Sequence, residues 1–330
     1  MTATRGLRIA VAGATGAVGS EVLAALDASS IPVGQLVAVA GEESLGTDIE
    51  FQGELSPVHA ELPALHGLDA VICCTPRGPA SEIARAALRA EVPCLDLSGV
   101  FADRAEVPMA WAGEPQDPAA PLVSAPPPTA LVWGPLLRAL AELAPIERVD
   151  GTVLEAASAS GRRGIEALSA ESMALFNQQE APEDGVLGHP LAFDCHPRSG
   201  SPSEGGRLRE RELRGALARW LEPAPALAAR WVAVPAFVGE ASSLGVRFAA
   251  PVDAARAAEC LAKAAGVELW EREGEGPNLR ASAGSDTVIA ARPEADPDDA
   301  ARLRLWAVGD VLRLAAANVV AVLAARPPRA

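Results

Sequence analysis

The fold of this chain is decided by the segment Gly13-Ala14-Thr15-Gly16-Ala17-Val18-Gly19. An apolar run, Leu7-Arg8-Ile9-Ala10-Val11-Ala12, precedes it, and Ser20-Glu21-Val22-Leu23-Ala24-Ala25-Leu26 follows it. We therefore expect a buried strand, a glycine turn and a helix in that order. Such a turn aims the unpaired N–H groups and positive dipole end of the helix at an anion, usually a dinucleotide pyrophosphate.

Length and charge narrow the class of protein. With 330 residues, the chain is long enough for two domains and a large core. Its 28 Lys and Arg residues face 43 Asp and Glu residues, which gives a net charge of −15. Nucleic acids and anionic membranes both select clustered positive charge, so we expect neither as a partner. A small molecule or a protein is the expected partner.

Targeting signals and metal-ligand spacings are missing from the sequence. The N-terminal residues lack the charged segment, apolar region and cleavage site of a secretory signal, and no apolar stretch reaches about 18 residues. The cytoplasm is therefore the expected location. The five cysteines show no zinc-ligand spacing and no disulfide pattern, so we expect no metal. Cys73 and Cys74 lie in an apolar run and are expected to be buried.

The first third of the chain alternates apolar runs with helical patterns, which is typical of an α/β fold with a parallel sheet. Strands are expected at residues 8–12, 36–40, 70–75 and 94–97, and helices at 20–26 and 79–90. A cofactor then belongs at the carboxyl ends of these strands. We assign residues 1–125 to a dinucleotide-binding domain.

A proline-dense run at residues 107–128 is expected to be a rigid connection between domains. The domain after it, residues 126–330, has mixed patterns. Strands are expected at 149–157, 231–238 and 244–250, helices at 129–144, 164–177, 204–221 and 254–265, and a loop at 197–206. A final helix is expected at 300–325, where charged residues interrupt the apolar pattern, so a core helix is favoured over a membrane anchor.

Several separated segments together resemble the aspartate-semialdehyde dehydrogenase family. They are Gly13–Gly19, Glu42-Glu43-Ser44-Leu45-Gly46, Asp96-Leu97-Ser98-Gly99-Val100-Phe101, Ser158-Ala159-Ser160-Gly161-Arg162-Arg163-Gly164-Ile165-Glu166, His189-Pro190-Leu191-Ala192-Phe193-Asp194 and Gly309-Asp310-Val311-Leu312-Arg313. The resemblance covers nearly the whole chain. It implies a homodimer of two-domain chains, with a parallel-sheet NAD(P)-binding domain, a mixed α/β dimerisation domain and a final helix that returns to the first domain.

The resemblance also implies a reaction. Members of this family form an acyl thioester on a cysteine, exchange hydride with NADP and release an acyl phosphate, with a histidine as acid and base. A thiolate suits this chemistry because it attacks an aldehyde and later leaves. The family's cysteine position falls on Pro128, or on Pro127 if the register slips by one. The adjacent Thr129 is expected to be a helix N-cap.

Other family positions depart from the pattern. The arginine that pairs with a substrate carboxylate aligns with Ala233, and the histidine aligns with Glu240. The family's substrate-side glutamine aligns with Glu155, and its phosphate-contacting arginine aligns with Ala102. Alanine cannot replace the bidentate grip of a guanidinium. We therefore expect no intact catalytic set, with Pro128, Glu155, Ala233 and Glu240 at the family's positions.

The cofactor positions are partly retained. The residues expected to contact a dinucleotide are Gly13, Thr15, Gly16, Ala17, Val18, Gly19, Glu43, Ser44 and Thr75. The family's Arg-Ser pair, which meets the 2′-phosphate of NADP, reads Glu43-Ser44 here, beside Glu42. Carboxylates repel a 2′-phosphate and accept a hydrogen bond from a 2′-hydroxyl, so NAD is favoured over NADP.

The residues leave three hypotheses open. The leading one is a dimeric family member that has lost thiol catalysis and binds NAD or acts as a regulatory partner. The second is an active oxidoreductase that uses Glu240 or Glu155 as general acid or base in a mechanism without cysteine. The third is a structural dimer, or a mixed dimer with an active paralogue, in which the cleft is empty.

Overall fold

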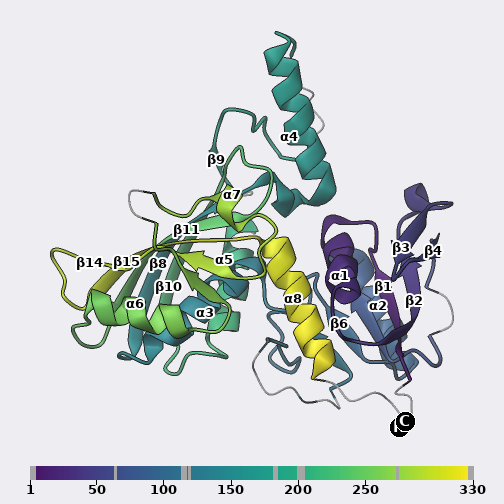
Figure 1. The fold of residues 1–330 in the computed structure, drawn as a ribbon, viewed down its shortest axis with the longest axis horizontal. Helices are drawn as coiled ribbons and strands as arrows, with labels where there is room; N and C mark the ends of the chain where they lie inside the picture. The colour runs from purple at the N-terminus through teal and green to yellow at the C-terminus, as the bar shows by residue number, and fades with distance from the viewer. Residues whose placement is uncertain are drawn as a thin grey trace. The chain divides into compact units, whose positions relative to one another are not determined.

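The computed structural model describes residues 5–62, 65–112, 117, 120–180, 185–198, 205–272 and 275–325, apart from the side chains of 205–207. It contains two compact units. The first comprises Met1–Pro127 and Ala315–Ala330, and the second comprises Pro128–Leu314. The expected α/β class, a parallel-sheet unit with a second mixed α/β unit, is confirmed (Figure 1).

Within its described residues, the first unit has a seven-stranded sheet in the order β3-β4-β2-β1-β5-β6-β7. All neighbours run parallel except β3 and β4, which are antiparallel. The strands are β1 (Leu7–Ala12), β2 (Val33–Val39), β3 (Asp48–Phe51), β4 (Glu54–His59), β5 (Ala70–Cys73), β6 (Cys94–Asp96) and β7 (Leu122–Ser124). The helical segments are α1 (Ala17–Asp27), η1 (Glu42–Ser44), α2 (Arg77–Arg89) and most of α8 (Val311–Ala324).

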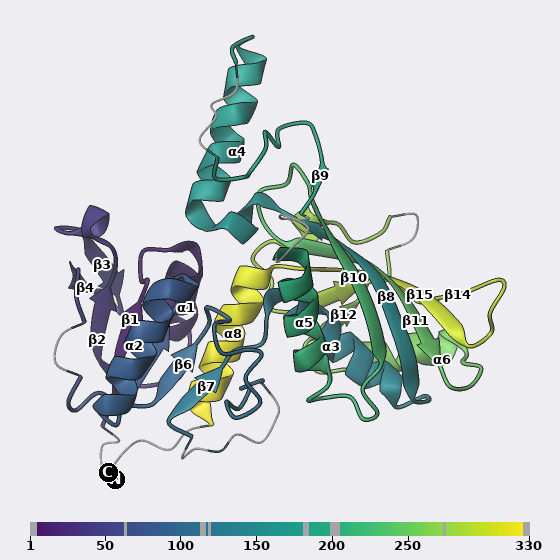
Figure 2. The same ribbon diagram turned by 180° about the vertical axis from the view of Figure 1, so that it is seen from behind.

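Helices cover both faces of this sheet, which explains why β1 is apolar at every position after Arg8. Ile9 and Val11 face a core that α1 and α8 complete, whereas Ala10 and Ala12 face a core that α2 completes. Figure 2 shows α2 beside the strands of this unit. A strand buried on both faces carries no polar alternation, so its apolar run is itself the signature of a parallel sheet.

The end of the chain belongs to the first core. Ala316, Val319, Val322 and Leu323 of α8 are buried in the same cluster as Ile9. Asn318 is buried too, and its side chain accepts a hydrogen bond from the N–H of Ala112 at 2.7 Å and donates one to the carbonyl of Ala110 at 3.0 Å. The polar residue within this apolar helix therefore satisfies two backbone groups that would otherwise be buried without partners.

Two expectations for the first unit need correction. The proline-dense run at 107–128 is not only a connection, because Leu122-Val123-Ser124 contains no proline and pairs with β6 as a seventh strand. The hairpin of β3 and β4 was also not anticipated. Polar and apolar residues alternate in β3, but this strand has only four residues, and Pro57 lies within β4.

The second unit is built on a mixed sheet, eight-stranded within its described residues, in the order β12-β13-β15-β11-β8-β10-β9, with β14 paired to β15. The strands are β8 (Ile146–Glu155), β9 (His196–Pro197), β10 (Ala226–Ala233), β11 (Glu240–Phe248), β12 (Val267–Leu269), β13 (Val288–Ala290), β14 (Glu294–Ala295) and β15 (Arg302–Gly309). The helical segments are α3 (Pro128–Ala141), η2 (Ala157–Ser160), α4 (Gly161–Phe176), α5 (Gly205–Leu217), α6 (Ala254–Lys263) and α7 (Leu279–Ser282). Of the expected loop at 197–206, residues 199–204 lie outside the described residues.

The expected final helix at residues 300–325 is wrong in its first part. Residues 302–309 form β15, which pairs antiparallel with β11 along its whole length. Leu303, Leu305 and Ala307 alternate with Arg302, Arg304 and Trp306, so the apolar positions fit a period of two. The helix begins only at Val311.

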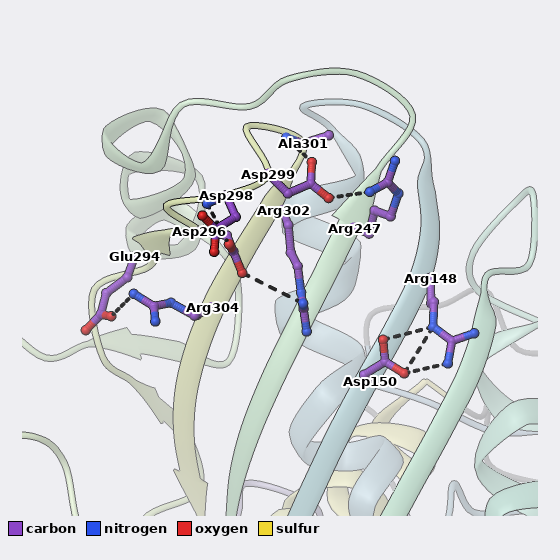
Figure 3. Close-up of polar contacts among 10 residues, drawn as sticks. All are labelled: Arg148, Asp150, Arg247, Glu294, Asp296, Asp298, Asp299, Ala301, Arg302 and Arg304. Carbon is purple, nitrogen blue, oxygen red and sulfur yellow. Dashed lines mark hydrogen bonds and ion pairs between the residues drawn. The ribbon is translucent and has the colours of Figure 1, made fainter.

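Charged residues cross one end of the second sheet (Figure 3). In the strand register, Arg247 lies directly opposite both Arg148 and Arg302. Like charges in such positions repel, and each arginine here has an acidic partner instead. Arg148 pairs with Asp150 at 2.7 Å, Arg302 approaches Asp296 at 3.8 Å, and Arg247 pairs with Asp299. These exposed pairs neutralise a row of arginines at the end of the sheet that lies away from Glu155 and Glu240.

Candidate functional site

The glycine turn of the first unit allows very close backbone approach. Gly13 has φ +83°, and a Cβ atom there would lie 2.6 Å from the carbonyl oxygen of Cys74. A Cβ atom at Gly19 would collide with the carbonyl of Gly13. The N–H groups of Gly13 and Ala14 both donate to the carbonyl of Val39, at 2.8 and 2.9 Å. Glycine is thus required for the turn to fit between the ends of β1, β2 and β5.

The helix that follows starts without a side-chain cap. Gly16 is the N-cap residue of α1 and has no side chain to accept a hydrogen bond from the first turn. The first N–H groups of a helix have no intrahelical partner, so those of Ala17 and Val18 are available to an anion. This geometry fits the pyrophosphate of a dinucleotide.

The other expected cofactor residues lie at the same end of the sheet. The hydroxyls of Thr15 and Ser44 share a hydrogen bond of 3.0 Å, which joins the glycine turn to η1 after β2. The carboxylate of Glu43 folds back over Gly41, and the side chain is exposed. Thr75 follows β5 and contacts the thiol of Cys73 at 3.2 Å. The carboxyl ends of three adjacent strands therefore bring together all the residues predicted for the cofactor.

Two neighbouring cysteines lie where β5 ends, and Cys73 is buried as expected whereas Cys74 is only partly buried. Burial raises the pKa of both the Cys73 and the Cys74 thiol. The nearby carboxyl of Asp96, whose own pKa is raised by burial, adds to both shifts. A raised pKa keeps a thiol protonated and unreactive, so the expectation that these cysteines are structural agrees with their environment.

The second unit gathers the positions that the family resemblance singled out. Strand register places Glu155 of β8 directly opposite Glu240 of β11 and beside Ala233 of β10. Directly opposed residues have Cβ atoms about 5 Å apart and project from the same face of a sheet. Pro128 opens α3 on this face, and the hydroxyl of the next residue, Thr129, donates to Glu240 Oε2 at 2.9 Å.

Thr129 therefore has a different role from the expected N-cap. It is the second residue of α3, and its hydroxyl points to the sheet instead of closing the helix end. The indole N–H of Trp231 donates to the same hydroxyl at 3.2 Å. One turn further along α3, the indole N–H of Trp133 donates to the hydroxyl of Ser242 at 2.8 Å. These tertiary contacts attach α3 to β10 and β11.

Two arginines contact the carboxyl group of Glu155, and neither is among the site residues that the sequence predicts. Its Oε1 accepts a hydrogen bond from Arg209 of α5 at 2.6 Å, and its Oε2 lies 3.1 Å from Nε of Arg198. Arg198 follows β9 and Arg209 lies on α5, so both are far from Glu155 in the sequence. No motif connects these positions, so only the packing of β9 and α5 against β10 reveals them.

Glu240 has no comparable cation. It is 2% exposed, and burial raises its pKa to about 8. The charge of Glu155 adds to this shift, whereas the hydroxyls of Thr129 and Ser242 and the guanidinium of Arg209 oppose it. Its Oε1 has no hydrogen bond of normal geometry. Glu240 is therefore largely protonated at neutral pH and is able to donate or accept a proton near that pH.

The exposed cysteine of the second unit has no base attached to it. Cys195 is exposed, and no hydrogen bond joins it to His196 among the described residues. The ring of His196 instead packs edge-on against His189, with centroids 5.5 Å apart. The contacts of the described residues therefore do not join Cys195 and His196 as a thiolate–imidazole pair.

Two other kinds of site, a metal centre and a membrane-spanning helix, are absent from the described residues. No group of three or more His, Cys, Asp or Glu side chains is arranged to hold a metal ion within that part of the chain. None of its helices is long and apolar enough to span a bilayer.

Comparison with known proteins identifies two family models. The model described as semialdehyde dehydrogenase, NAD binding domain, matches residues 8–117, and the model described as semialdehyde dehydrogenase, dimerisation domain, matches residues 136–314. Together they support the family expected from the sequence segments.

Individual relatives match over nearly full length. The aspartate-semialdehyde dehydrogenase of Synechocystis is 29% identical and covers 94% of both chains. A Pseudomonas aeruginosa protein named USG-1 protein homolog is 27% identical, again over 94% of both. Aspartate semialdehyde dehydrogenase II of Vibrio cholerae, solved with ASA, superposes with a TM-score of 0.89 at 23% identity, covering 98% of both chains. This last likeness shows the fold.

The raised pKa of Glu240 predicts a specific pH dependence of stability. Between about pH 4.5 and pH 8, the folded state retains a proton that the unfolded state has released, so this group lowers the free energy of unfolding as pH rises. A Glu240→Gln variant has no ionisable group at this position, so this fall in the free energy of unfolding with rising pH does not occur in it. We expect its Tm to exceed that of the wild type by an amount that grows from pH 5 to pH 8.5, equivalent to a few kcal/mol.

Differential scanning calorimetry across this range would measure the effect. Glu268→Gln, the same substitution at an exposed position of β12, is the matched control and should leave the difference from wild type constant. Parallel curves for wild type and Glu240→Gln would contradict the assignment of a raised pKa to Glu240.

Proposed function

The chain belongs to the semialdehyde dehydrogenase family, and from this premise we propose that it is a dinucleotide-binding homodimer without the family's cysteine thioester chemistry. The contact that carries the proposal is the hydrogen bond between Thr129 and Glu240, next to Pro128 and Ala233. Proline, followed by the hydroxyl of Thr129, and a mostly protonated carboxyl are present where the resemblance implies a thiol and an imidazole.

The distribution of cysteines supports the absence of a thioester. No cysteine lies between Cys94 and Cys195 in the sequence. Cys195 is exposed, and Cys260 lies on α6. Thr129 is a poor nucleophile because its neighbour Glu240 is largely protonated and so is a weak base at neutral pH.

The glycine turn supports a retained cofactor. Its close approach to β5 and the uncapped start of α1 form a cradle that suits a pyrophosphate. Glu42 and Glu43 are both exposed at the end of β2, where the ribose of a dinucleotide is expected. Two carboxylates there favour NAD over NADP.

A second candidate is an oxidoreductase that reduces a carbonyl compound without a covalent intermediate. When bound, a reduced nicotinamide supplies the hydride to the carbonyl carbon. Glu240, with a pKa of about 8, is suited to give its proton to the carbonyl oxygen, which becomes a hydroxyl. The raised pKa of this one residue is the observation that favours this candidate.

Cofactor preference is tested by exchanging the charge at residue 43. We expect wild-type protein to bind NAD⁺ more tightly than NADP⁺ in isothermal titration calorimetry. Glu43→Arg should reverse the preference by about tenfold or more, because a guanidinium pairs with the 2′-phosphate. Glu54→Arg, at an exposed position of β4, is the control and should retain the wild-type preference. A wild-type preference for NADP⁺, or no binding of either dinucleotide, would refute this part of the proposal.

The absence of thiol chemistry is tested with the family's reaction. Purified protein given aspartate semialdehyde, phosphate and NAD⁺ or NADP⁺ should show no phosphate-dependent reduction of the dinucleotide. Phosphate-dependent reduction that disappears in Cys195→Ser, or after another single cysteine is blocked, would overturn the proposal. Turnover of a different carbonyl compound that Glu240→Gln slows would instead favour the second candidate.

The dimer is tested by its mass. The match of residues 136–314 to a dimerisation domain supports association of two chains. Sedimentation equilibrium should therefore give twice the chain mass of 33.8 kDa. A particle with the mass of one chain at micromolar concentration would argue against the dimer.

A further inference from the structure

Two guanidinium groups converge on one buried carboxylate at the end of the second sheet. Arg209 donates to Glu155 Oε1 at 2.6 Å, and Nε of Arg198 lies 3.1 Å from Glu155 Oε2. The side chain of Glu155 is 11% exposed, and those of Arg198 and Arg209 are 15% and 38% exposed. The three groups thus form a partly enclosed site that solvent reaches from the side of Arg209.

Neighbouring elements deliver these arginines to the position where β10 ends. His196 of β9 pairs with Ala233, and the N–H of Arg198 donates to the carbonyl of Trp231 at 2.9 Å. Arg209 reaches the same place from α5, which packs against β10. Ala233 itself contributes only a methyl group. The end of β10 therefore carries no cationic side chain of its own, and the two arginines come from the neighbouring segments, one after β9 and one in α5.

The site carries more positive than negative charge. Glu155 is a single carboxylate between two guanidiniums, which are always protonated. Glu240, which lies opposite Glu155, is largely neutral near pH 7 because its pKa is raised to about 8. Asp310, which follows β15 at the same end of the sheet, accepts hydrogen bonds from the N–H groups of Gly284 and Leu312. The nearby buried carboxylate of Glu171 is engaged elsewhere, since its Oε2 accepts hydrogen bonds from the N–H groups of Leu191 and Ala192. One guanidinium charge is thus left for an external anion.

Polar atoms at this end of the sheet lack hydrogen bonds. Nε of Arg198 and Oε2 of Glu155 form an ion pair whose geometry is not that of a hydrogen bond. Nε2 of His196 and Oε1 of Glu240 are also buried without hydrogen-bond partners. Glu240 is 2% exposed, and only 11% of the Glu155 side chain is exposed. Buried polar atoms are normally satisfied, so such a group of atoms marks a place for a polar ligand.

We propose that Arg198 and Arg209 form a binding site for a small carboxylate, in which the side chain of Glu155 acts as an internal competitor. The carboxylate of Glu155 already presents one oxygen to each guanidinium. A ligand carboxylate has the same planar shape, and its two oxygens match the N–H groups of a guanidinium. Arg209 is the more exposed of the two arginines, whereas the other nitrogens of Arg198 donate to the carbonyl of Leu187 at 3.4 Å and to the hydroxyl of Ser160 at 3.5 Å. The site depends on the second unit alone and does not require a dinucleotide.

Removing the internal competitor is the sharpest test. In Glu155→Gln, both guanidiniums lose their anionic partner while the side chain keeps its size. We expect this variant to bind acetate about tenfold or more tightly than the wild type in isothermal titration calorimetry at low salt. Inorganic phosphate is titrated in parallel, and it should bind more weakly than acetate.

Arginine variants identify the binding groups. Adding Arg209→Met or Arg198→Met to Glu155→Gln should remove the gain in acetate affinity. Adding Arg256→Met, at an exposed position of α6, should leave the gain unchanged. Arg209→Met in the otherwise wild-type chain provides a second measurement, because this half-exposed side chain is easily lost without disturbing the core and its removal should weaken acetate binding.

Three outcomes would overturn the proposal. They are unchanged acetate affinity in folded Glu155→Gln, acetate binding that both arginine variants retain, and tighter binding of phosphate than of acetate. If Glu155→Gln fails to fold, equal acetate affinity in wild type and Arg209→Met overturns it as well. Because no arm of this experiment contains NAD⁺, its failure is distinguishable from a failure of the cofactor proposal.

Discussion

The register between β8 and its two neighbours is the constraint on which the second unit depends. It places Glu155 opposite Glu240 and beside Ala233, and a slip of one residue would turn each of these side chains to the other face of the sheet. Gly151 helps to hold the arrangement, because a Cβ atom there would collide with the ring of Trp133. The absence of that atom lets α3 lie close to the sheet, and this closeness brings Thr129 within hydrogen-bond distance of Glu240.

The two opposed carboxyl groups meet the cost of burial in different ways. Glu155 lies between the guanidinium groups of Arg209 and Arg198, whereas Glu240 has a hydroxyl partner and remains largely protonated. Two ionised carboxylates so close together would repel each other, so the protonation of one stabilises the charge of the other. The contacts between Glu155 and the two arginines and the raised pKa of Glu240 therefore depend on each other.

In the first unit, the main constraint on the backbone is steric and not electrostatic. Its turn from β1 to α1 fits only if Gly13 and Gly19 carry no side chain, since the backbone at Gly13 touches that at Cys74 and Gly19 touches that at Gly13. The hydrogen bond between Thr15 and Ser44 then joins this turn to the segment after β2. At this turn, backbone N–H groups and not charged side chains point to the place proposed for an anion.

Local patterns in the sequence determined the first unit well. The apolar run before Gly13 and the glycine spacing specify a buried strand, a tight turn and a helix through contacts that are close along the chain. They also predict that the residues proposed for the cofactor lie together, because parallel strands bring their carboxyl ends to one edge. The segment at 302–309 was misjudged as helix, since its apolar positions fit both periods and only pairing with β11 distinguishes them. Arg198, Arg209 and the role of Thr129 were decided by tertiary structure alone. Their partners lie on other strands and helices, and the pKa of Glu240 depends on burial and on charges that no stretch of sequence contains.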